Sequence, residues 1–362
     1  MNNNFAVIMA GGIGSRFWPM SKEEFPKQFL DVLGIGRTLI QMTYDRLQKV
    51  VPDSQIYVVT NENYKALVIE QLGISANQVL TEPMRKNTAP CIAYAAHKIH
   101  SINQNANLIV APADHLILKE DRFVSIINTA IQKAEEGDNI VTLGIKPSRP
   151  DTGYGYIQFV NDNDIIMGEV RKVKQFTEKP NRELAEIFLK GGDYYWNSGI
   201  FIWTSQTIID ALNRFKPELN ALFCTKGNDY NTTNEQEFVN NAFTNCEDIS
   251  IDFAVLENSK HVHVVLANFG WSDLGTWGSL YTHLDKDVEG NAVIGDDVHL
   301  FDSENCIINL PKDKLAVIQG LDNHIVVESD GVLMIVKKED EQKIKGYLKE
   351  VKKTSPKFIN RG

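Results

Sequence analysis

The sequence predicts an α/β protein with a mostly parallel sheet covered by helices on both faces, followed by a small all-β module. Over roughly the first 150 residues, short apolar runs alternate with amphipathic stretches, which is typical of strand–helix–strand units. The length of 362 residues suits one large domain and a smaller one. After residue 285 the pattern changes to short strands separated by turns. We therefore expect a main domain over 1–285 and a β module with a terminal helix over 286–362.

The main domain begins with alternating strands and helices. Strands are expected at 5–10, 55–60, 78–83, 107–115 and 139–145. Helices are expected at 38–50, 62–72, 89–101 and 123–138. In such sheets ligands collect beyond the carboxyl ends of the strands, and both "MAGGIG" and "VAPADH" lie at such ends.

The second half of the main domain begins with a pair of extended runs, 152–160 and 169–180, which we expect to form a lid or a wall. Helical patterns follow at 182–192 and 205–215, and the polar segment 224–237 is expected to be a surface loop with a helix start.

The C-terminal module contains six short apolar runs. They lie at 291–295, 298–301, 306–310, 315–320, 324–329 and 332–338. This spacing predicts a short coil of stacked strands resembling a β-helix. A solvated terminal helix is expected at 339–353. The strands of the β module could cover the main domain or pair with a partner, and the second alternative predicts a homodimer.

The composition excludes several classes of protein. A net charge of −10 and a pI of about 5.4 argue against nucleic-acid binding, which needs a basic surface. No stretch approaches the roughly 20 apolar residues of a membrane span, and "FAVIMA" lacks the basic segment of a signal peptide before it. The four cysteines show no metal-site spacing, so we expect reduced thiols and a cytoplasmic protein.

The loop "MAGGIGSRFWP" after the first expected strand has the features of a phosphate site. Its glycines allow backbone amides to approach a phosphate, while Arg16 and Lys27 offer a forked guanidinium and a compact ammonium. It is neither a Walker A loop nor a dinucleotide fingerprint, since Phe17 occupies the place of the third glycine. A glycine turn alone is often only a turn. Together with Arg16 and Lys27, it predicts polyphosphate binding.

These residues resemble the signature of the sugar-nucleotidyltransferase family, GGxGxR with a downstream PK. The "FWP" and "PKQFL" segments are similar to those of mannose-1-phosphate guanylyltransferases. The resemblance continues through "RKNTAP", "APADH", "TGYGYI", "FTEKP", "WNSGIF", "SIDFAVLE" and "GWSDLGTW", which covers about the first 285 residues in order. It implies a Rossmann-like fold of the nucleotide-diphospho-sugar transferase type. The implied reaction uses GTP and mannose 1-phosphate to make GDP-mannose and pyrophosphate, with Mg²⁺ as cofactor.

The resemblance also implies the metal ligands. Asp114 follows an apolar strand directly, where a carboxylate suits the hard Mg²⁺ ion, and the family pairs it with an aspartate at the position of Asp273. Each aspartate could instead cap a helix. Arg16, Lys27 and Asp114 are the expected catalytic residues, and His115 is expected only to support them.

The remaining motifs provide the expected substrate contacts. Asn87 and Thr88 precede a helix that starts near Pro90, so one of them is expected to cap it, with proline as its first helical residue. By resemblance they are also expected to face guanine and ribose. Glu178 and Lys179 can meet sugar hydroxyls and phosphate, or form a surface ion pair worth little. The tryptophans are expected to be packing anchors. The complete set of expected substrate contacts is Ala10, Gly11, Gly12, Gly14, Ser15, Arg16, Lys27, Asn87, Thr88, Gly153, Tyr154, Glu178, Lys179 and Asn197.

Departures and alternatives remain at this point. Lys22 stands where the family usually shows arginine, which keeps the charge and loses the fork. The chain ends soon after the β module, so no isomerase activity is expected. Two alternative functions remain. The chain could be a related transferase that uses another nucleotide or hexose phosphate, or a catalytically silent sugar-nucleotide sensor. A silent protein should lack a metal ligand or the loop arginine, whereas this chain has all four charged residues, Arg16, Lys27, Asp114 and Asp273.

Overall fold

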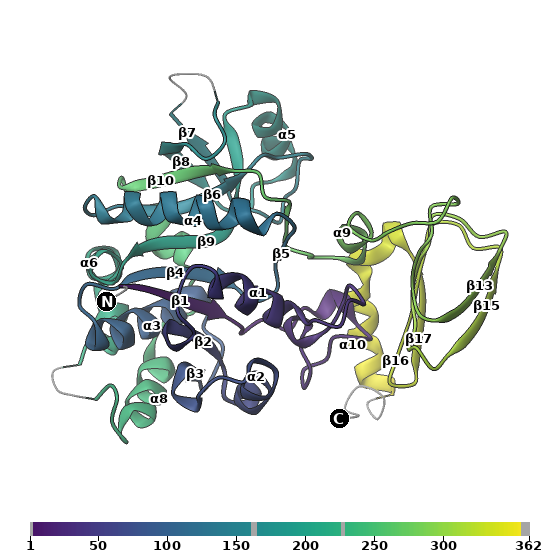
Figure 1. Ribbon diagram of the computed structural model, residues 1–362, viewed down its shortest axis with the longest axis horizontal. Coiled ribbons are helices and arrows are strands. Elements are labelled where there is room, and N and C mark those ends of the chain that lie inside the picture. Colours follow the sequence, from purple (N-terminus) through teal and green to yellow (C-terminus); the bar gives the residue numbers. More distant parts are fainter. Residues whose placement is uncertain (1–2, 161–164, 226–228, 356–362) are drawn as a thin grey trace. The chain divides into compact units, whose positions relative to one another are not determined.

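The computed structural model describes residues 3–160, 165–225 and 229–355 (Figure 1). The chain forms two compact units. The first unit comprises Met1–Gly11, Thr43–Ala113 and Ile117–Trp271, and the second comprises Gly12–Met42, Asp114–Leu116 and Ser272–Gly362. The division into domains at residue 285 stays a prediction, because compactness groups the glycine loop and the Asp114 segment with the C-terminal residues. Residues 226–228 of the expected surface loop and 356–362 of the expected module lie outside the described residues.

The first unit contains a nine-stranded sheet in the order β3-β2-β1-β4-β9-β6-β10-β8-β7. Its strands are β1 (Asn4–Met9), β2 (Ile56–Asn61), β3 (Val79–Glu82), β4 (Asn107–Pro112), β6 (Ile140–Ile145), β7 (Tyr156–Phe159), β8 (Val170–Thr177), β9 (Tyr194–Thr204) and β10 (Val262–Ala267). Helices of this unit are α2 (Lys65–Leu72), α3 (Thr88–Ile102), α4 (Glu120–Glu135), α5 (Arg182–Gly191), α6 (Ser205–Phe215), α7 (Pro217–Phe223) and α8 (Glu235–Asn245). Most expected strands and helices of the first half are therefore confirmed within a few residues.

The sheet is mixed, so the expectation of a mostly parallel sheet is wrong. Strands β3, β2, β1 and β4 run parallel, as do β6 and β10. The eleven-residue strand β9 lies antiparallel between β4 and β6. Strands β7 and β8 pair as expected and extend the edge of this same sheet. They therefore do not form a separate lid, whereas the alternative of a wall that faces the sugar stays a prediction. The physical reason for the mixed sheet is that "YYWNSGIFIWT" is itself a strand, buried on both faces.

Helices cover both faces of the sheet, as expected. Phe5 and Val7 of β1 belong to a buried cluster with residues of α3, α6, α7 and α8. The alternate residues Ala6 and Ile8 point to the opposite face and are also fully buried. Helix α4 packs on β4, β6, β9 and β10 and lies across that opposite face in Figure 1.

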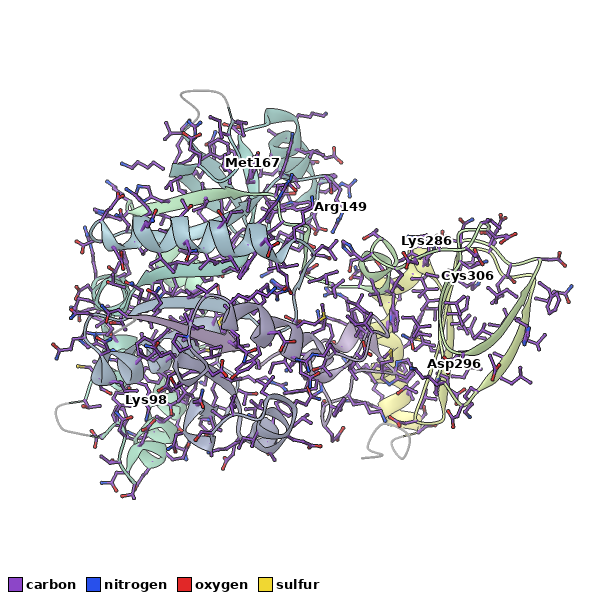
Figure 2. The ribbon with its side chains drawn as sticks, in the orientation of Figure 1. Lys98, Arg149, Met167, Lys286, Asp296 and Cys306 are labelled. Carbon is purple, nitrogen blue, oxygen red and sulfur yellow. The ribbon has the colours of Figure 1, made fainter. Side chains whose placement is uncertain are left out.

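The second unit contains the β module and the segments that surround it. Strands β12 (Ala292–Ile294), β14 (Ile307–Asn309), β16 (His324–Ser329) and β17 (Val332–Lys337) form one sheet, and β13 (Asp297–Phe301) pairs in parallel with β15 (Leu315–Gln319). Neighbours β12, β14 and β16 are also parallel. Cys306 and Ile308 lie in a buried cluster inside the module, and Figure 2 labels Cys306 there.

Helices of the second unit are short. They are α9 (Trp277–Tyr281), α10 (Ile344–Thr354) and the 3-10 turns η1 (Ser15–Phe17), η2 (Lys27–Phe29) and η7 (Lys338–Lys343). The expected terminal helix is thus divided into a 3-10 turn and an α-helix. Helix α1 (Leu39–Gln48) and strands β5 (Leu116–Ile117) and β11 (Trp271–Ser272) lie where the chain passes from one unit to the other. No described helix is long and apolar enough to cross a membrane.

Candidate functional site

Lys27 is the centre of the predicted phosphate and metal residues of the second unit. Its side chain is only 4% exposed, and its ammonium lies 2.8 Å from Oδ2 of Asp114. It also donates to the main-chain oxygens of Asp273 and Leu274, at 2.9 and 3.0 Å. We call Lys27, Asp114, Asp273 and Leu274 the Lys27 cluster. The structure therefore brings together three predicted residues that lie far apart in the sequence.

The loop geometry explains how Lys27 is aimed. Pro26 precedes the turn η2, and the Lys27 amide donates to the oxygen of Ile13. Gly14 has a φ of +68°, and a Cβ there would lie 2.3 Å from Cβ of Lys27. Gly14 is thus required by the lysine that packs against it, whereas a Cβ on Gly12 would meet nothing within 4 Å. The predicted glycine loop has two different kinds of glycine.

Asp114 is held ionised by its surroundings. Burial raises the pKa of a carboxyl, but the charges of Lys27 and His115 and the hydrogen bond from Lys27 outweigh it, so the pKa of Asp114 lies below its usual value. The supporting role expected of His115 stays a prediction. Asp273 accepts a hydrogen bond from the Gly275 amide at its Oδ1. Asp114 therefore offers an ionised carboxylate beside the Lys27 ammonium, and Asp273 contacts the same ammonium through its main chain.

Arg16 of the glycine loop and Lys22, which follows the loop, have partners in the C-terminal part of the chain. Arg16 donates through Nε to Oε1 of Gln342, at 3.0 Å. Lys22, with a side chain only 5% exposed, pairs with Asp330 at 2.5 Å. The ammonium of Lys22 therefore has a structural partner, and a phosphate role for it stays a prediction.

The side chains of the first unit that are predicted to bind the sugar form a second group. Asn197 accepts from the Thr142 hydroxyl at 2.8 Å and donates from Nδ2 to Oδ1 of Asp252 at 3.0 Å. Glu178 approaches the same place, because a Cβ on Gly155 would lie 2.5 Å from Oε2 of Glu178 and 3.4 Å from Cβ of Asn197. We call Thr142, Glu178, Asn197 and Asp252 the Asn197 cluster. The amide of Asn197 is thus oriented by protein partners on both sides.

Asp252 has an unusual electrostatic environment. Burial and the neighbouring Glu178 charge raise the pKa of Asp252 to about 7, against smaller lowering effects that include Lys179. Lys179 has a φ of +46° and pairs with Oε1 of Glu178 at 2.7 Å. The pair is asymmetric, since the side chain of Glu178 is 7% exposed and that of Lys179 is 61% exposed. The exposed ammonium is the part of this group that solvent reaches most easily.

Aromatic side chains lie near these predicted sugar-binding residues in the first unit. Tyr154 packs edge-on against Trp196 and Trp271, with centroids 4.9 and 5.4 Å apart. Arg149, labelled in Figure 2, lies 5.2 Å from the Trp196 ring. The Gly153 amide donates to Oδ1 of Asp151 at 2.8 Å. Trp196 is almost fully buried, which agrees with the expected packing role.

The predicted base loop caps helix α3. Asn87 is the N-cap, and its side chain accepts from the Thr88 amide. The Thr88 hydroxyl in turn accepts from the Ile251 amide at 2.9 Å. The predicted capping is confirmed, but Pro90 is the third helical residue and not the first, because the helix begins at Thr88.

The start of the predicted nucleotide loop lies at the ends of β1 and β3. Ala10 donates to the oxygen of Val59 and accepts from the Thr60 hydroxyl, so its peptide belongs to the sheet edge. A Cβ on Gly11 would lie 3.5 Å from Oε2 of Glu82. Burial raises the pKa of Glu82 to about 7, against lowering by Cys91 and Arg85. Ser15 begins the turn η1.

Three polar residues, two in the first unit and one in the second, were not predicted from the sequence. They are Glu82, Asp252 and Gln342. Asp252 lies in the quoted motif "SIDFAVLE", which was the available signal, but its partners Asn197 and Glu178 are far away in the sequence. Nothing in the sequence marks Gln342.

Comparison with known proteins agrees with the motifs. A family model described as nucleotidyl transferase matches residues 5–290. The chain belongs to the nucleotidyl transferase family. It is 38% identical over 343 residues to the alginate biosynthesis protein AlgA of Pseudomonas fluorescens, covering 94% of this chain and 70% of that protein. It is 36% identical over 356 residues to a mannose-1-phosphate guanylyltransferase of Escherichia coli, covering 95% and 75%. The family recognised from the motifs is confirmed.

A solved structure resembles nearly the whole chain. The crystal structure described as mannose-1-phosphate geranyltransferase from Thermus thermophilus has a TM-score of 0.85 and 27% sequence identity. The match covers 97% of this chain and 100% of that chain. The likeness therefore includes both the large sheet and the β module.

Proposed function

We propose that this chain is a mannose-1-phosphate guanylyltransferase, which makes GDP-mannose and pyrophosphate from GTP and mannose 1-phosphate. Relatives at 36–38% identity over most of the chain include several guanylyltransferases of this name. The observation in this structure that carries the proposal is the Lys27 cluster, in which one buried ammonium holds the Asp114 carboxylate and the Asp273 main chain. Such a group suits the binding of a polyphosphate.

The proposed chemistry needs no general base. A phosphate oxygen of mannose 1-phosphate, already an anion near neutral pH, attacks the α-phosphorus of GTP. The new bond joins that oxygen to the α-phosphorus, and the bond to the β-phosphate oxygen breaks, so that pyrophosphate leaves with the electron pair. The protein then has to position two anions and neutralise their charge.

We propose that Asp114 and Asp273 of the Lys27 cluster hold Mg²⁺. The described residues contain no group of three or more His, Cys, Asp or Glu side chains arranged to hold a metal. Two carboxylates are nevertheless the usual protein share of a Mg²⁺ site, since substrate phosphates and water supply the other oxygen ligands. When bound, the ion would neutralise charge on the reacting phosphates.

The chain's own residues have separate proposed tasks. Lys27 and Arg16 hold the triphosphate and steady the leaving pyrophosphate, helped by backbone amides of the glycine loop. Lys179 meets the phosphate of the sugar substrate with its exposed ammonium. Glu178 and Asn197 read sugar hydroxyls, although Asn197 already donates one hydrogen to Asp252. The remaining proposed contacts are Ala10, Gly11, Gly12, Gly14, Ser15, Asn87, Thr88, Gly153 and Tyr154.

We also propose a fold type, an oligomeric state and a cellular location for this protein. The parallel run β3-β2-β1-β4 supports a Rossmann-like interpretation of one half of the sheet, and the parallel pairs of the module support a short β-helix. A homodimer through the module is supported by the exposed Phe301, Leu315 and Val317 on β13 and β15. A cytoplasmic location, without nucleic-acid or membrane partners, fits the acidic composition.

The test is pyrophosphate release with Mg²⁺, using five nucleoside triphosphates against mannose 1-phosphate and glucose 1-phosphate. The nucleotides are GTP, UTP, CTP, ATP and dTTP. The proposal expects turnover mainly with GTP and mannose 1-phosphate. Turnover with a different pair would replace the substrates and keep the reaction type, and absence of turnover with every pair would favour a silent sugar-nucleotide sensor.

A further inference from the structure

The turn η7 contacts two segments of the second unit through neighbouring side chains. Gln342 accepts from Nε of Arg16 at 3.0 Å. Glu341 accepts through Oε2 from the Gly278 amide at 2.7 Å. Arg16 follows the glycine loop, and Gly278 follows the segment that carries Asp273. One short turn near the C-terminus therefore contacts both the segment that carries Arg16 and the segment that carries Asp273.

Glu341 is fitted closely to the start of helix α9. The Thr276 side chain caps this helix by accepting from the Ser279 amide. The Gly278 amide is taken by Glu341 instead, and a carboxylate is favoured where helical amides have no partner within the helix. A Cβ on Gly278 would lie 3.0 Å from Oε2 of Glu341 and 3.2 Å from its Oε1. Glycine at 278 thus allows the carboxylate to approach the backbone.

Gln342 uses only one side of the Arg16 guanidinium. This hydrogen bond is made at Nε, so Gln342 does not occupy the two terminal nitrogens. The two terminal nitrogens form a fork that can clasp phosphate oxygens. Lys345, one turn further along the chain, has a pKa lowered by burial and by the charge of Arg16. Two cations are thus held near one another, an arrangement that a bound anion would relieve.

A common hydrophobic core supports these polar contacts. Phe17, Trp277 and Ile344 belong to one buried cluster, and each is fully buried. They are the sequence neighbours of Arg16, Gly278 and η7 respectively. The rings of Phe17 and Trp277 pack with centroids 5.0 Å apart. The three segments are therefore packed together, which limits how far each can move independently.

We propose that η7 positions the triphosphate site, with Gln342 orienting the Arg16 guanidinium and Glu341 fixing the segment that carries Asp273. The proposal rests on the proposed function, because it assumes that Arg16 and Asp273 serve nucleotidyl transfer. Gln342 and Glu341 are positioning residues, since they act through these two residues. The β module and its final helices then contribute to GTP use as well as to the fold.

The experiment compares steady-state kinetics of the full chain with each substrate varied in turn. We expect Gln342→Ala to lower kcat/KM for GTP by about five- to tenfold, the effect of losing one typical hydrogen bond, while the KM for mannose 1-phosphate stays unchanged. Gln342→Glu keeps the acceptor, so this variant is expected to keep most of the parent kcat/KM for GTP. Glu341→Ala should lower kcat whichever substrate is varied. Glu341→Gln should keep most of the parent kcat. The matched control is Glu339→Ala, an exposed residue of the same turn, with no expected effect.

The double variant Arg16→Ala with Gln342→Ala separates positioning from general damage. If Gln342 acts through Arg16, adding Gln342→Ala to Arg16→Ala has no further effect on kcat/KM for GTP, and the melting temperatures of the single variants stay close to that of the parent. Equal losses in both backgrounds, or a loss explained by melting, would overturn the proposal for Gln342. An Arg16→Ala variant with parent kinetics would overturn both this proposal and the proposed role of Arg16, whereas a parent chain without turnover would overturn the proposed function itself.

Discussion

The Lys27 cluster sets a buried ammonium beside the Asp114 carboxylate, whereas the Asn197 cluster sets the Asp252 carboxyl beside Glu178. The pKa of Asp114 is therefore lowered and that of Asp252 is raised to about 7. At neutral pH the first aspartate carries its charge fully, and the second is partly protonated. The difference separates a group suited to phosphates and a cation from a group suited to neutral hydroxyls. It also gives each cluster a distinct response to mutation and pH.

Loss of the Lys27 ammonium should have a large effect on turnover. Lys27→Met keeps much of the volume but leaves Asp114 without its ion pair, and the triphosphate loses a buried cation. We expect kcat/KM to fall by about 10²- to 10³-fold, as for other removed groups that stabilise charge in a transition state. Steady-state kinetics of pyrophosphate release measures this.

The matched control is Lys98→Met, because Lys98 on α3 (Figure 2) is also buried and paired with a carboxylate, Glu235. It should lower the melting temperature without changing kcat. Equal kinetic losses in the two variants would show that Lys27 matters only for stability.

Gly14→Ala should disturb the same cluster through packing. The positive φ of 68° and the 2.3 Å approach of a Cβ to Lys27 both oppose alanine, so the lysine or the loop must shift. We expect a loss of about 10-fold or more in kcat/KM together with a destabilisation of about 1–3 kcal/mol. Chemical denaturation and kinetics measure the two effects.

Gly36→Ala provides the comparison for Gly14→Ala. Gly36 has a φ of +81° but no atom within 4 Å of its Cβ position. It should lose stability alone. If it lost activity as much as Gly14→Ala does, backbone strain and not displacement of Lys27 would be the cause.

Asn197→Asp should affect the sugar side selectively. It replaces the Nδ2 donor beside Asp252 with a second carboxylate oxygen, so the two carboxyls oppose each other at neutral pH. We expect the KM for mannose 1-phosphate to rise about tenfold, with a smaller change in the KM for GTP, as measured by varying each substrate separately. A change confined to GTP would contradict the assignment of the Asn197 cluster to the sugar.

Asp252→Asn should have the smallest effect on turnover, and should instead change how stability depends on pH. The folded pKa of about 7 exceeds the usual value of 3.8, so the folded protein binds more protons between these values and loses stability as pH rises through this window. The asparagine variant keeps an acceptor for Asn197 and lacks this loss. We expect it to gain stability relative to the parent as pH rises from about 4 to 8, by on the order of 4 kcal/mol, in denaturation measured across that range. A difference independent of pH would contradict the raised pKa.

The sequence predicted the alternating elements of the first unit because strands and helices there have distinct apolar periods. It also indicated Gly14, Lys27, Asp114 and Asp273, but the contact of Gly14 with Lys27 depends on side-chain packing that no local pattern contains. Strand β9 was missed as an antiparallel insertion because its motif "WNSGIF" was interpreted only as a ligand segment.

The polar residues that were missed have long-range partners. Asp252 meets Asn197, and Gln342 meets Arg16, 326 positions away in the chain. Their importance follows from the fold that brings those partners together. Local propensity therefore predicted the elements well and these pairs not at all.

The most direct test of the account is pyrophosphate release by Asp114→Asn with GTP, mannose 1-phosphate and Mg²⁺. The substitution keeps the shape of the side chain and removes the charge that pairs with Lys27. The account predicts a variant that melts cooperatively near the parent temperature and shows almost no turnover. Turnover equal to that of the parent would remove Asp114 from the mechanism and contradict the assignment of the Lys27 cluster to nucleotidyl transfer.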